Sequence, residues 1–443
     1  MNIYFVSLGC DKNLVDSEKM LGRLYKSGYQ ITMDIDSADI IVINTCSFIH
    51  DAREESVETI LEMAQYKTHG NVKALIVVGC LAERYKDEIM KEIPEVDALI
   101  GTSSFNEIDK VIKQVMEGKN PSVFYDLDRL PLVDEKRILT FGSHYAYLKI
   151  AEGCDKHCTY CVIPQLRGDY RSVPMEVLLE EAKQLAEQGV KELILVAQET
   201  TVYGLDLYKE KSLTKLLQEL CKIEGISWIR ILYSYPEEIT DELIQVIKNE
   251  PKICKYLDIP IQHASDRILK LMGRRTNKND LINIVEKLRT NISDIVLRTT
   301  LISGFPTETE DEHIELMDFV ESMKFDRLGV FTYSKEDNTP ASKLKPQIHG
   351  NTKKRRQKEI MQVQQEIAFK KNEDLIGNEI DVLIEGKLTD EEGVYIGRTY
   401  MDAPSVDGYI FVNSDKELLS GDIITARITN AENYDLIGTI IES

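Results

Sequence analysis

The stretch that decides the fold reads Glu152-Gly-Cys-Asp-Lys-His-Cys-Thr-Tyr-Cys-Val-Ile-Pro164. Its three cysteines, Cys154, Cys158 and Cys161, follow an apolar run at residues 147–150 that is typical of a buried strand. Three thiolates on one short loop can hold three corners of a cubane iron-sulfur cluster and leave its fourth iron open. A structural zinc site with His157 as the fourth ligand is the alternative that this stretch also allows.

Five further apolar runs follow the cysteine loop, and helical patterns separate them. The runs lie at residues 192–197, 228–233, 256–261, 294–302 and 326–333, with helical patterns at 175–188, 240–249 and 279–290. Six β/α units predict an incomplete TIM-like (β/α)6 barrel over residues 140–371. In such barrels the chemistry lies at the C-terminal ends of the strands, which is where the cysteine loop falls.

The region before this barrel predicts a different domain. Over residues 1–120, short apolar runs alternate with helical patterns, which is typical of βαβαβ and predicts a Rossmann-like parallel sheet. The runs lie at residues 3–6, 39–43 and 74–78, and the helical patterns at 16–27 and 53–64. Residues 121–139, rich in Pro, Asp and scattered apolar residues, are expected to form a linker.

Three cysteines of the N-terminal region stand at matched positions. Cys10, Cys46 and Cys80 each follow one of the three apolar runs, and ligands of an open parallel sheet bind outside the carboxyl ends of its strands. A single cysteine after a strand is usually a small buried residue, but three at the same offset predict a second ligand set. Cys221 and Cys254, within or beside helical segments, are expected to be core or surface residues.

The C-terminal region, residues 372–443, predicts a small all-β barrel of the OB-like kind that binds partners. Its five expected strands lie at residues 379–384, 393–399, 408–412, 423–429 and 436–441. It contains 4 basic and 16 acidic residues, a net charge of 4 − 16 = −12. That charge would repel phosphate and attract a basic protein, unless the module is only a tether with a solvated surface.

The rest of the composition narrows the class of protein. The net charge of the 443 residues is −21, which is unusual for a protein that wraps a nucleic acid, so a basic partner is expected instead. One basic run opposes this interpretation, although a solvated helix face explains it as well. It consists of Lys353, Lys354, Arg355 and Arg356.

Cellular location is also predicted from the sequence. No apolar run approaches the roughly 18 residues of a membrane span, and the first residues lack the features of an export signal, so we expect a cytoplasmic protein without a membrane partner. Thiols stay reduced in the cytoplasm, which favours metal ligands over disulfides for the 8 cysteines.

The spacing CxxxCxxC, with Tyr160 before the last cysteine, resembles the signature of the radical S-adenosylmethionine (SAM) superfamily. The resemblance implies that SAM binds the open iron and is cleaved to a 5'-deoxyadenosyl radical, so that the cofactor supplies the chemistry and the protein the orientation. It also implies cofactor contacts at Tyr160, Gln198, Glu199, Arg298 and Gly304, the glycine because backbone can approach a ligand there. A plain turn or a satisfied core polar group is the alternative for each.

With the second cysteine set, the whole chain resembles the radical SAM methylthiotransferase family, which has an N-terminal three-cysteine domain, a radical barrel and a C-terminal TRAM module. The resemblance implies two 4Fe-4S clusters, the second of which carries sulfur. One SAM would methylate that sulfur and another would supply the radical. External electron and sulfur donors are implied as well.

Two branches of that family differ in substrate. Ser7-Leu-Gly-Cys-Asp-Lys-Asn-Leu-Val-Asp-Ser-Glu18 and Phe48-Ile49 resemble the branch that methylthiolates the β-carbon of an aspartate in small-subunit ribosomal protein S-twelve. The alternative branch modifies an adenosine of transfer RNA. Asp11, in place of a usual Pro, and Ser47, in place of a usual Gly, depart from the ribosomal branch. A non-catalytic iron-sulfur or zinc protein is the alternative outside the family.

Overall fold

The computed structural model describes residues 1–131, 136–140, 142, 144–391 and 393–441, so part of the expected linker, residues 132–135, lies outside the described residues. The chain divides into two compact units, and each is described by itself. Unit 1 comprises Met1–Thr140, Lys149–Val173 and Ser334–Thr339. Unit 2 comprises Phe141–Leu148, Pro174–Tyr333 and Pro340–Ser443. Within the described part of the chain, no helix is both long and apolar enough to cross a membrane.

Unit 1 is built on a six-stranded sheet in the order β2-β1-β3-β4-β5-β6, and every neighbouring pair is parallel. The strands are β1 (Asn2–Ser7), β2 (Gln30–Thr32), β3 (Ile40–Thr45), β4 (Ala74–Gly79), β5 (Ala98–Ile100) and β6 (Ser122–Val123). The three predicted strands are confirmed as β1, β3 and β4. The other three have only two or three residues each, and β6 falls in the segment expected to be a linker.

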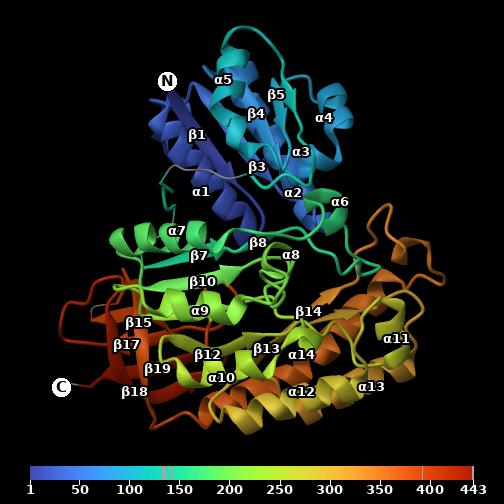
Figure 1. The fold of residues 1–443 in the computed structure, drawn as a ribbon, viewed down its shortest axis with the longest axis vertical. Helices are drawn as coiled ribbons and strands as arrows, with labels where there is room; N and C mark the ends of the chain where they lie inside the picture. Colours follow the sequence, from blue (N-terminus) through green and yellow to red (C-terminus); the bar gives the residue numbers. More distant parts are fainter. Residues whose placement is uncertain (132–135, 141, 143, 392, 442–443) are drawn as a thin grey trace. The chain divides into compact units, whose positions relative to one another are not determined.

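Helices cover both faces of this sheet (Figure 1). They are α1 (Asp11–Lys26), α2 (His50–His69), α3 (Cys80–Arg84), α4 (Lys86–Glu92) and α5 (Ile108–Met116). Helices α1 and α5 pack on one face, and α2, α3 and α4 on the other. Every residue of β3 and β4 is therefore buried, which explains why both strands are apolar over most of their length.

The cysteine loop of the radical-SAM-like segment belongs to unit 1. It lies between β8 (Ala151–Glu152) and β9 (Arg171–Ser172), which pair antiparallel, and it contains α6 (Ile163–Arg167). The hydroxyl group of Thr102 donates to the carbonyl oxygen of Leu166 at 2.7 Å and ties α6 to the rest of unit 1. Both cysteine sets therefore lie in one compact unit, whereas the predicted domain boundaries, which stay predictions, separate them.

Unit 2 contains a second six-stranded sheet, in the order β14-β13-β12-β11-β10-β7. The strands are β7 (Tyr145–Lys149), β10 (Glu192–Val196), β11 (Trp228–Ile231), β12 (Ile253–Asp258), β13 (Val296–Ser303) and β14 (Arg327–Thr332). Strands β10 to β14 pair in parallel, and the sheet does not close on itself, so the predicted incomplete barrel is confirmed. Cys254, expected in or beside a helix, lies instead on β12 and is buried.

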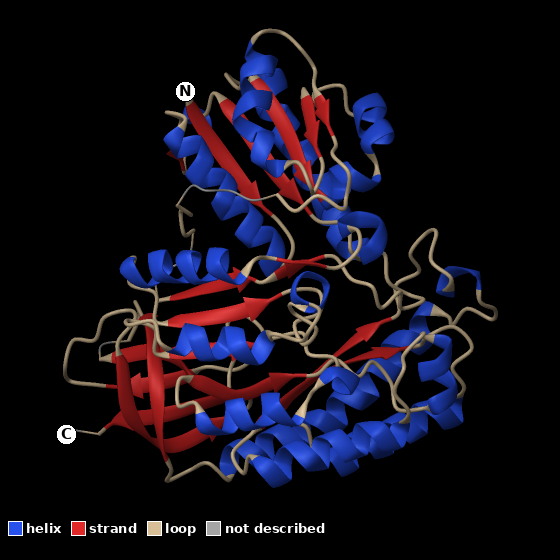
Figure 2. Ribbon diagram, in the orientation of Figure 1, coloured by secondary structure: helices blue, strands red, loops and turns tan. Residues whose placement is uncertain are grey.

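The helices of this part of the chain are drawn in blue in Figure 2. They are α7 (Met175–Glu187), α8 (Leu205–Tyr208), α9 (Leu213–Cys221), α10 (Asp241–Asn249), α11 (Asp266–Leu271), α12 (Lys278–Asn291), α13 (Glu310–Met323) and α14 (Gly350–Glu373). Cys221 is the last residue of α9 and is half-buried. The helical patterns predicted at 175–188, 240–249 and 279–290 correspond to α7, α10 and α12.

The C-terminal strands form a closed barrel in the order β15-β16-β17-β19-β18, as predicted. They are β15 (Glu379–Lys387), β16 (Val394–Thr399), β17 (Ile410–Asn413), β18 (Ile423–Glu432) and β19 (Asp435–Ile440). One hydrophobic core contains Ile194 and Tyr256 of the central sheet together with Val382 and Ile410 of the small barrel. The small barrel is therefore packed onto the sheet, not tethered to it.

Candidate iron-sulfur and cofactor site

The three N-terminal cysteines emerge at one edge of the unit 1 sheet. Cys10 precedes α1, Cys46 directly follows β3, and Cys80 directly follows β4 as the first residue of α3. Strands β1, β3 and β4 are neighbours and parallel, so their carboxyl ends lie side by side. Cys46 and Cys80 are buried, and Cys10 is exposed.

The backbone around Gly9 brings two of these loops together. Gly9 has a φ of +89°, and a Cβ there would lie 2.6 Å from the Cβ and 3.0 Å from the Sγ of Cys46. Only glycine fits such a position. The Asn13 side-chain amide donates to the carbonyl oxygen of Leu8 at 3.0 Å and to that of Thr45 at 2.9 Å, which fixes the first loop against the second.

The thiols of this set affect one another electrostatically. Burial, followed by the negative charges of Cys80 and Cys10, raises the pKa of Cys46 to about 12. Burial also raises the pKa of Cys80, and the guanidinium group of Arg167 opposes that rise. Thiolates are the form that binds metal, and soft sulfur donors suit iron-sulfur clusters. The donor set therefore fits a cluster.

The second loop is folded so that its three sulfurs also lie near one another. Burial and the charges of Cys158 and Cys154 raise the pKa of Cys161, whose sulfur accepts a hydrogen bond from the backbone N–H of Ile163 at 3.4 Å. The backbone N–H of Cys161 donates to the carbonyl oxygen of Cys158 at 3.0 Å, and that of Cys154 to Gly168 at 3.2 Å. The N–H···S bond from Ile163 is of the kind that the sulfurs of cluster ligands accept.

The zinc alternative needs His157 to converge with the three cysteines on one ion, whereas a cubane spreads three thiolates over three irons. Among the residues that the structure describes, no group of three or more His, Cys, Asp or Glu side chains is arranged around one ion position. His157, the suggested fourth ligand, is exposed.

Sequence reasoning missed Arg167, at the end of α6. Its Nη2 atom lies 3.5 Å from the Sγ atom of Cys80, although the two residues are far apart in the sequence. Arg167 is buried, with 3% of its surface exposed. The only signal in the sequence is a basic residue shortly after Cys161, and that signal does not identify its partner.

Two predicted cofactor contacts follow β10. β10 ends at Val196, and Gln198 and Glu199 follow it after Ala197. Glu199 is buried and accepts hydrogen bonds from both the backbone N–H, at 2.9 Å, and the hydroxyl group of Thr201. Its carboxylate therefore shapes this turn. Tyr160, on the cysteine loop of unit 1, is half-buried. The roles of all three in cofactor binding stay predictions.

Two other predicted contacts have partners inside unit 2. Gly304 follows β13 with a φ of +69°, and a Cβ there would meet the side chain of Lys353. The group that lies close to this glycine in the structure is therefore the Lys353 side chain of the same chain. Arg298, near the amino end of β13, pairs with Asp258 at 3.0 Å and with Asp407 of the small barrel at 3.4 Å. Arg298 thus joins the barrel to the sheet, and its contact with a cofactor stays a prediction.

Two of the four residues of the basic run at the start of α14 pair with carboxylates of the same unit. Arg356 pairs with Glu308 at 2.9 Å and with Glu310 at 3.0 Å. Arg355 pairs with Glu310 at 2.8 Å and with Glu359 at 2.9 Å. These pairs favour the interpretation of the basic run as an ordinary helix face over its interpretation as a nucleic-acid site.

Comparison with known protein families divides the chain into three parts. The uncharacterized protein family UPF0004 matches residues 2–101, the radical SAM superfamily matches residues 148–320, and the TRAM domain matches residues 376–441. These ranges cover, in order, the sheet of unit 1, the cysteine loop with most of the central sheet, and the small barrel.

Relatives resemble the chain over its full length. Proteins named ribosomal protein uS12 methylthiotransferase RimO are 62% identical in Lachnoclostridium phytofermentans, over 99% of this chain and 100% of the relative. The identity is 53% in Acetivibrio thermocellus, over 98% and 97%, and 49% in Clostridioides difficile, over 100% and 99%.

Solved structures share the fold at low identity. The radical SAM methyltransferase TsrM from Kitasatospora setae, solved with tryptophan and a SAM analogue, is 12% identical, with a TM-score of 0.56 over 74% of this chain and 72% of that one. The cobalamin-dependent SAM radical enzyme OxsB is 14% identical, with a TM-score of 0.54 over 77% and 54%. At such identities the likeness concerns the fold alone.

The full-length relatives, the three matched families and the two cysteine sets agree on one assignment. The resemblance inferred from the cysteine spacing is thereby confirmed at the level of the family. The chain belongs to the RimO family of radical SAM methylthiotransferases.

Proposed function

We propose that this chain transfers a methylthio group to the β-carbon of an aspartate in ribosomal protein uS12. The observation that carries the proposal is the presence of two three-cysteine sets in one compact unit, in a chain whose full-length relatives are named for this reaction. A radical enzyme needs one such set, and the second provides the place for the sulfur that is transferred.

Each set holds one 4Fe-4S cluster in this proposal. Cys154, Cys158 and Cys161 bind the cluster whose open iron takes SAM, and Cys10, Cys46 and Cys80 bind the auxiliary cluster. When bound, these groups supply the radical and the methylthio sulfur. Tyr160, Gln198, Glu199, Arg298 and Gly304 are proposed to line the SAM site.

The chain's own residues fix the ligands and keep water away from them. Gly9 and Asn13 fix the first loop against the second, and the Ile163 N–H orients the Cys161 sulfur. Cys46, Cys80, Cys154 and Cys158 are each no more than 7% exposed. Because a radical is quenched by side reactions in water, such burial is what the chemistry requires.

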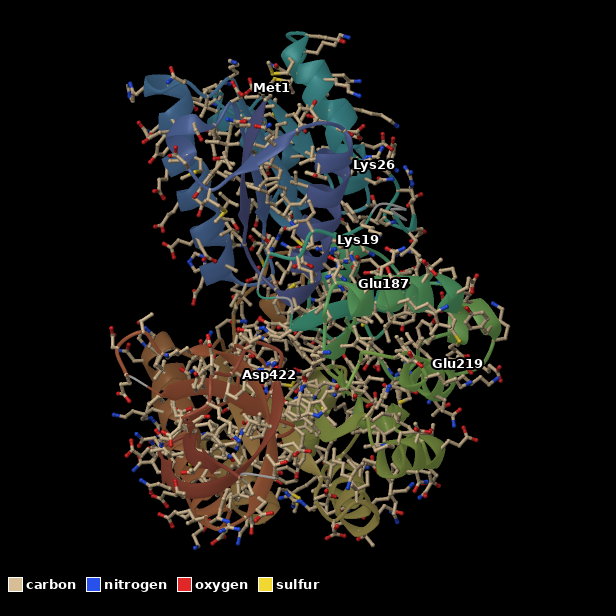
Figure 3. All side chains as sticks on the ribbon, turned by 90° about the vertical axis from the view of Figure 1, so that its left-hand side faces the viewer. Met1, Lys19, Lys26, Glu187, Glu219 and Asp422 are labelled. Carbon is tan, nitrogen blue, oxygen red and sulfur yellow. The ribbon has the colours of Figure 1, made fainter. Side chains whose placement is uncertain are left out.

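The small barrel is proposed to receive the substrate, because its surface is acidic. Its described residues include seven exposed carboxylates: Glu379, Asp381, Asp390, Glu391, Asp415, Glu417 and Glu432. Its exposed basic residues are Lys387, Lys416 and Arg427, and Glu379 already neutralises Arg427 at 2.6 Å. The side chain of Asp422 adds to the acidic character of the barrel (Figure 3).

A basic ribosomal protein would be steered toward such a surface, whereas the phosphates of transfer RNA would be repelled. We place the reaction in the cytoplasm, where thiols stay reduced and where external electron and sulfur donors can reach the enzyme.

Two matched variants test the division of labour. Protein purified without oxygen should contain about eight irons, and Cys46→Ala and Cys158→Ala about four each. Cys46→Ala should still cleave SAM but transfer no methylthio group to uS12, whereas Cys158→Ala should do neither. Methylthio transfer at the normal rate by Cys46→Ala would contradict the proposal, and colourless wild-type protein that contains zinc would contradict both clusters.

A further inference from the structure

Arg167 connects the loop of one cysteine set to a ligand of the other. It is the last residue of α6, six residues after Cys161, and its Nη2 atom donates to the Cys80 sulfur at 3.5 Å. Leu166 of the same helix and Val162, which directly precedes the helix, form a small buried cluster with Cys80. Cys80 is therefore in contact with the other loop through both apolar and polar groups.

The guanidinium group is held in a fixed orientation by its two nitrogens. Nη1 donates to Asp16 at 2.8 Å and to Glu152 at 3.0 Å. Nη2 donates to the side-chain oxygen of Asn13 as well as to the Cys80 sulfur. An arginine fork is planar, so carboxylates on one nitrogen determine where the other one points. Here it points at a proposed cluster ligand.

Lys149 shares both carboxylates of this fork with Arg167. It pairs with Asp16 and, at 2.6 Å, with Glu152. All four of these side chains are buried, at 3–5% exposure. Negative charge that develops on the Cys80 side therefore lies in a water-excluded environment that already presents an N–H donor to it. Hydrogen bonds to cluster sulfurs favour the reduced, more negative state.

We propose that Arg167 is a positioning residue for the reaction, which holds the Cys80 sulfur toward the auxiliary cluster and raises the reduction potential of that cluster. The inference rests on the proposed function, because it requires a cluster on Cys10, Cys46 and Cys80. The step concerned is the addition of one electron from a reductant to the 4Fe-4S core, which makes it more negative by one charge.

Three variants test this. Arg167→Gln removes the charge, Arg167→Lys keeps the charge but cannot form the fork, and Arg171→Gln is the matched control. Arg171 lies in the same loop, and its guanidinium donates to the backbone carbonyl oxygens of Asp169 and Arg167, not to a sulfur. Each protein is loaded with iron and sulfide without oxygen, and its iron content and reduction potentials are measured.

The readout is a redox titration followed by electron paramagnetic resonance. SAM changes the spectrum of the cluster that it binds, so the cluster that does not respond is the auxiliary one. We expect Arg167→Gln to shift its potential to more negative values or to lose about four of about eight irons. We expect Arg167→Lys to show a smaller change in the same direction, and Arg171→Gln none.

Wild-type iron content and an unchanged auxiliary potential in Arg167→Gln would overturn the inference. A wild-type protein with only about four irons would instead overturn the proposed function. The two failures are therefore distinguishable by the wild-type measurement.

Discussion

Removal of the Arg398 side chain from the small barrel should destabilise the protein. Its Nη2 atom lies 2.7 Å from Glu192 of β10, and its Nε atom lies 2.5 Å from Glu385 of β15. Glu192 also pairs with Arg230 at 2.7 Å, and the side chains of Arg398, Glu192 and Arg230 have no exposed surface. One buried guanidinium group therefore compensates two carboxylates between the barrel and the sheet.

Arg398→Met keeps most of the side-chain volume and removes the charge. Glu192 is left with Arg230, and Glu385 with His144, whose Nε2 atom is 3.4 Å away. Removal of one partner from a buried ion pair typically destabilises a protein by about 3–5 kcal/mol. At roughly 2 °C per kcal/mol for a unit of this size, the melting temperature should fall by about 6–10 °C.

Scanning calorimetry measures this change, and the barrel provides a matched control. Arg427 pairs with Glu379 at 2.6 Å, but these side chains are 59% and 51% exposed. Arg427→Met should therefore cost less than about 1 kcal/mol. The reasoning is refuted if Arg398→Met lowers the melting temperature no more than Arg427→Met does.

Three further changes have defined outcomes. Gly9→Ala should lose the auxiliary cluster, about half of the iron, because a Cβ would lie 2.6 Å from that of Cys46; Gly28→Ala, with the same φ of +89° and no atom within 4 Å, should keep it. Burial lowers the pKa of His263 to about 3. The positive charges of His313, Arg356 and Arg267 act in the same direction, and the negative charge of Glu312 opposes them. Between pH 7.5 and 5 the unfolded chain binds a proton that the folded chain does not, so the free energy of unfolding should fall by about 2 kcal/mol. Urea titrations of His263→Gln should lack this loss. An equal pH dependence of the unfolding free energy in the variant and the wild type would contradict the expectation. Asp381→Lys and Glu417→Lys should each weaken uS12 binding by about 1 kcal/mol or less and reduce its salt dependence in calorimetric titrations, whereas tighter binding would rule out the acidic barrel as the docking surface.

Long apolar runs predicted the architecture well, for a physical reason. Strands buried on both faces, such as β3 and β4, contain only apolar or small residues over most of their length. Strands β2, β5 and β6 have two or three residues each, too few for any period to show. The strand β12 begins at Ile253, before the apolar run that was expected to mark it, which is why Cys254 was assigned to a helical segment.

The parts of the site that sequence could not predict depend on tertiary contacts. Arg167 and Cys80 are 87 positions apart, and nothing local to either residue indicates the other. Arg298 and Gly304 matched a superfamily pattern, but their partners, Asp407 and Lys353, come from distant segments. Charged residues are rarely fully buried, so composition would place Arg230 and Arg398 on the surface. Only the folded chain shows the carboxylate that they share.

The central claim is that this chain places a methylthio group on uS12. The most direct test is the intact mass of purified uS12 after incubation, without oxygen, with the iron-loaded enzyme, a reductant, a sulfide source and SAM, with transfer RNA treated in parallel. We predict that uS12 gains the mass of one methylthio group on an aspartate and that transfer RNA is unchanged. Unmodified uS12 beside methylthiolated transfer RNA would contradict the account.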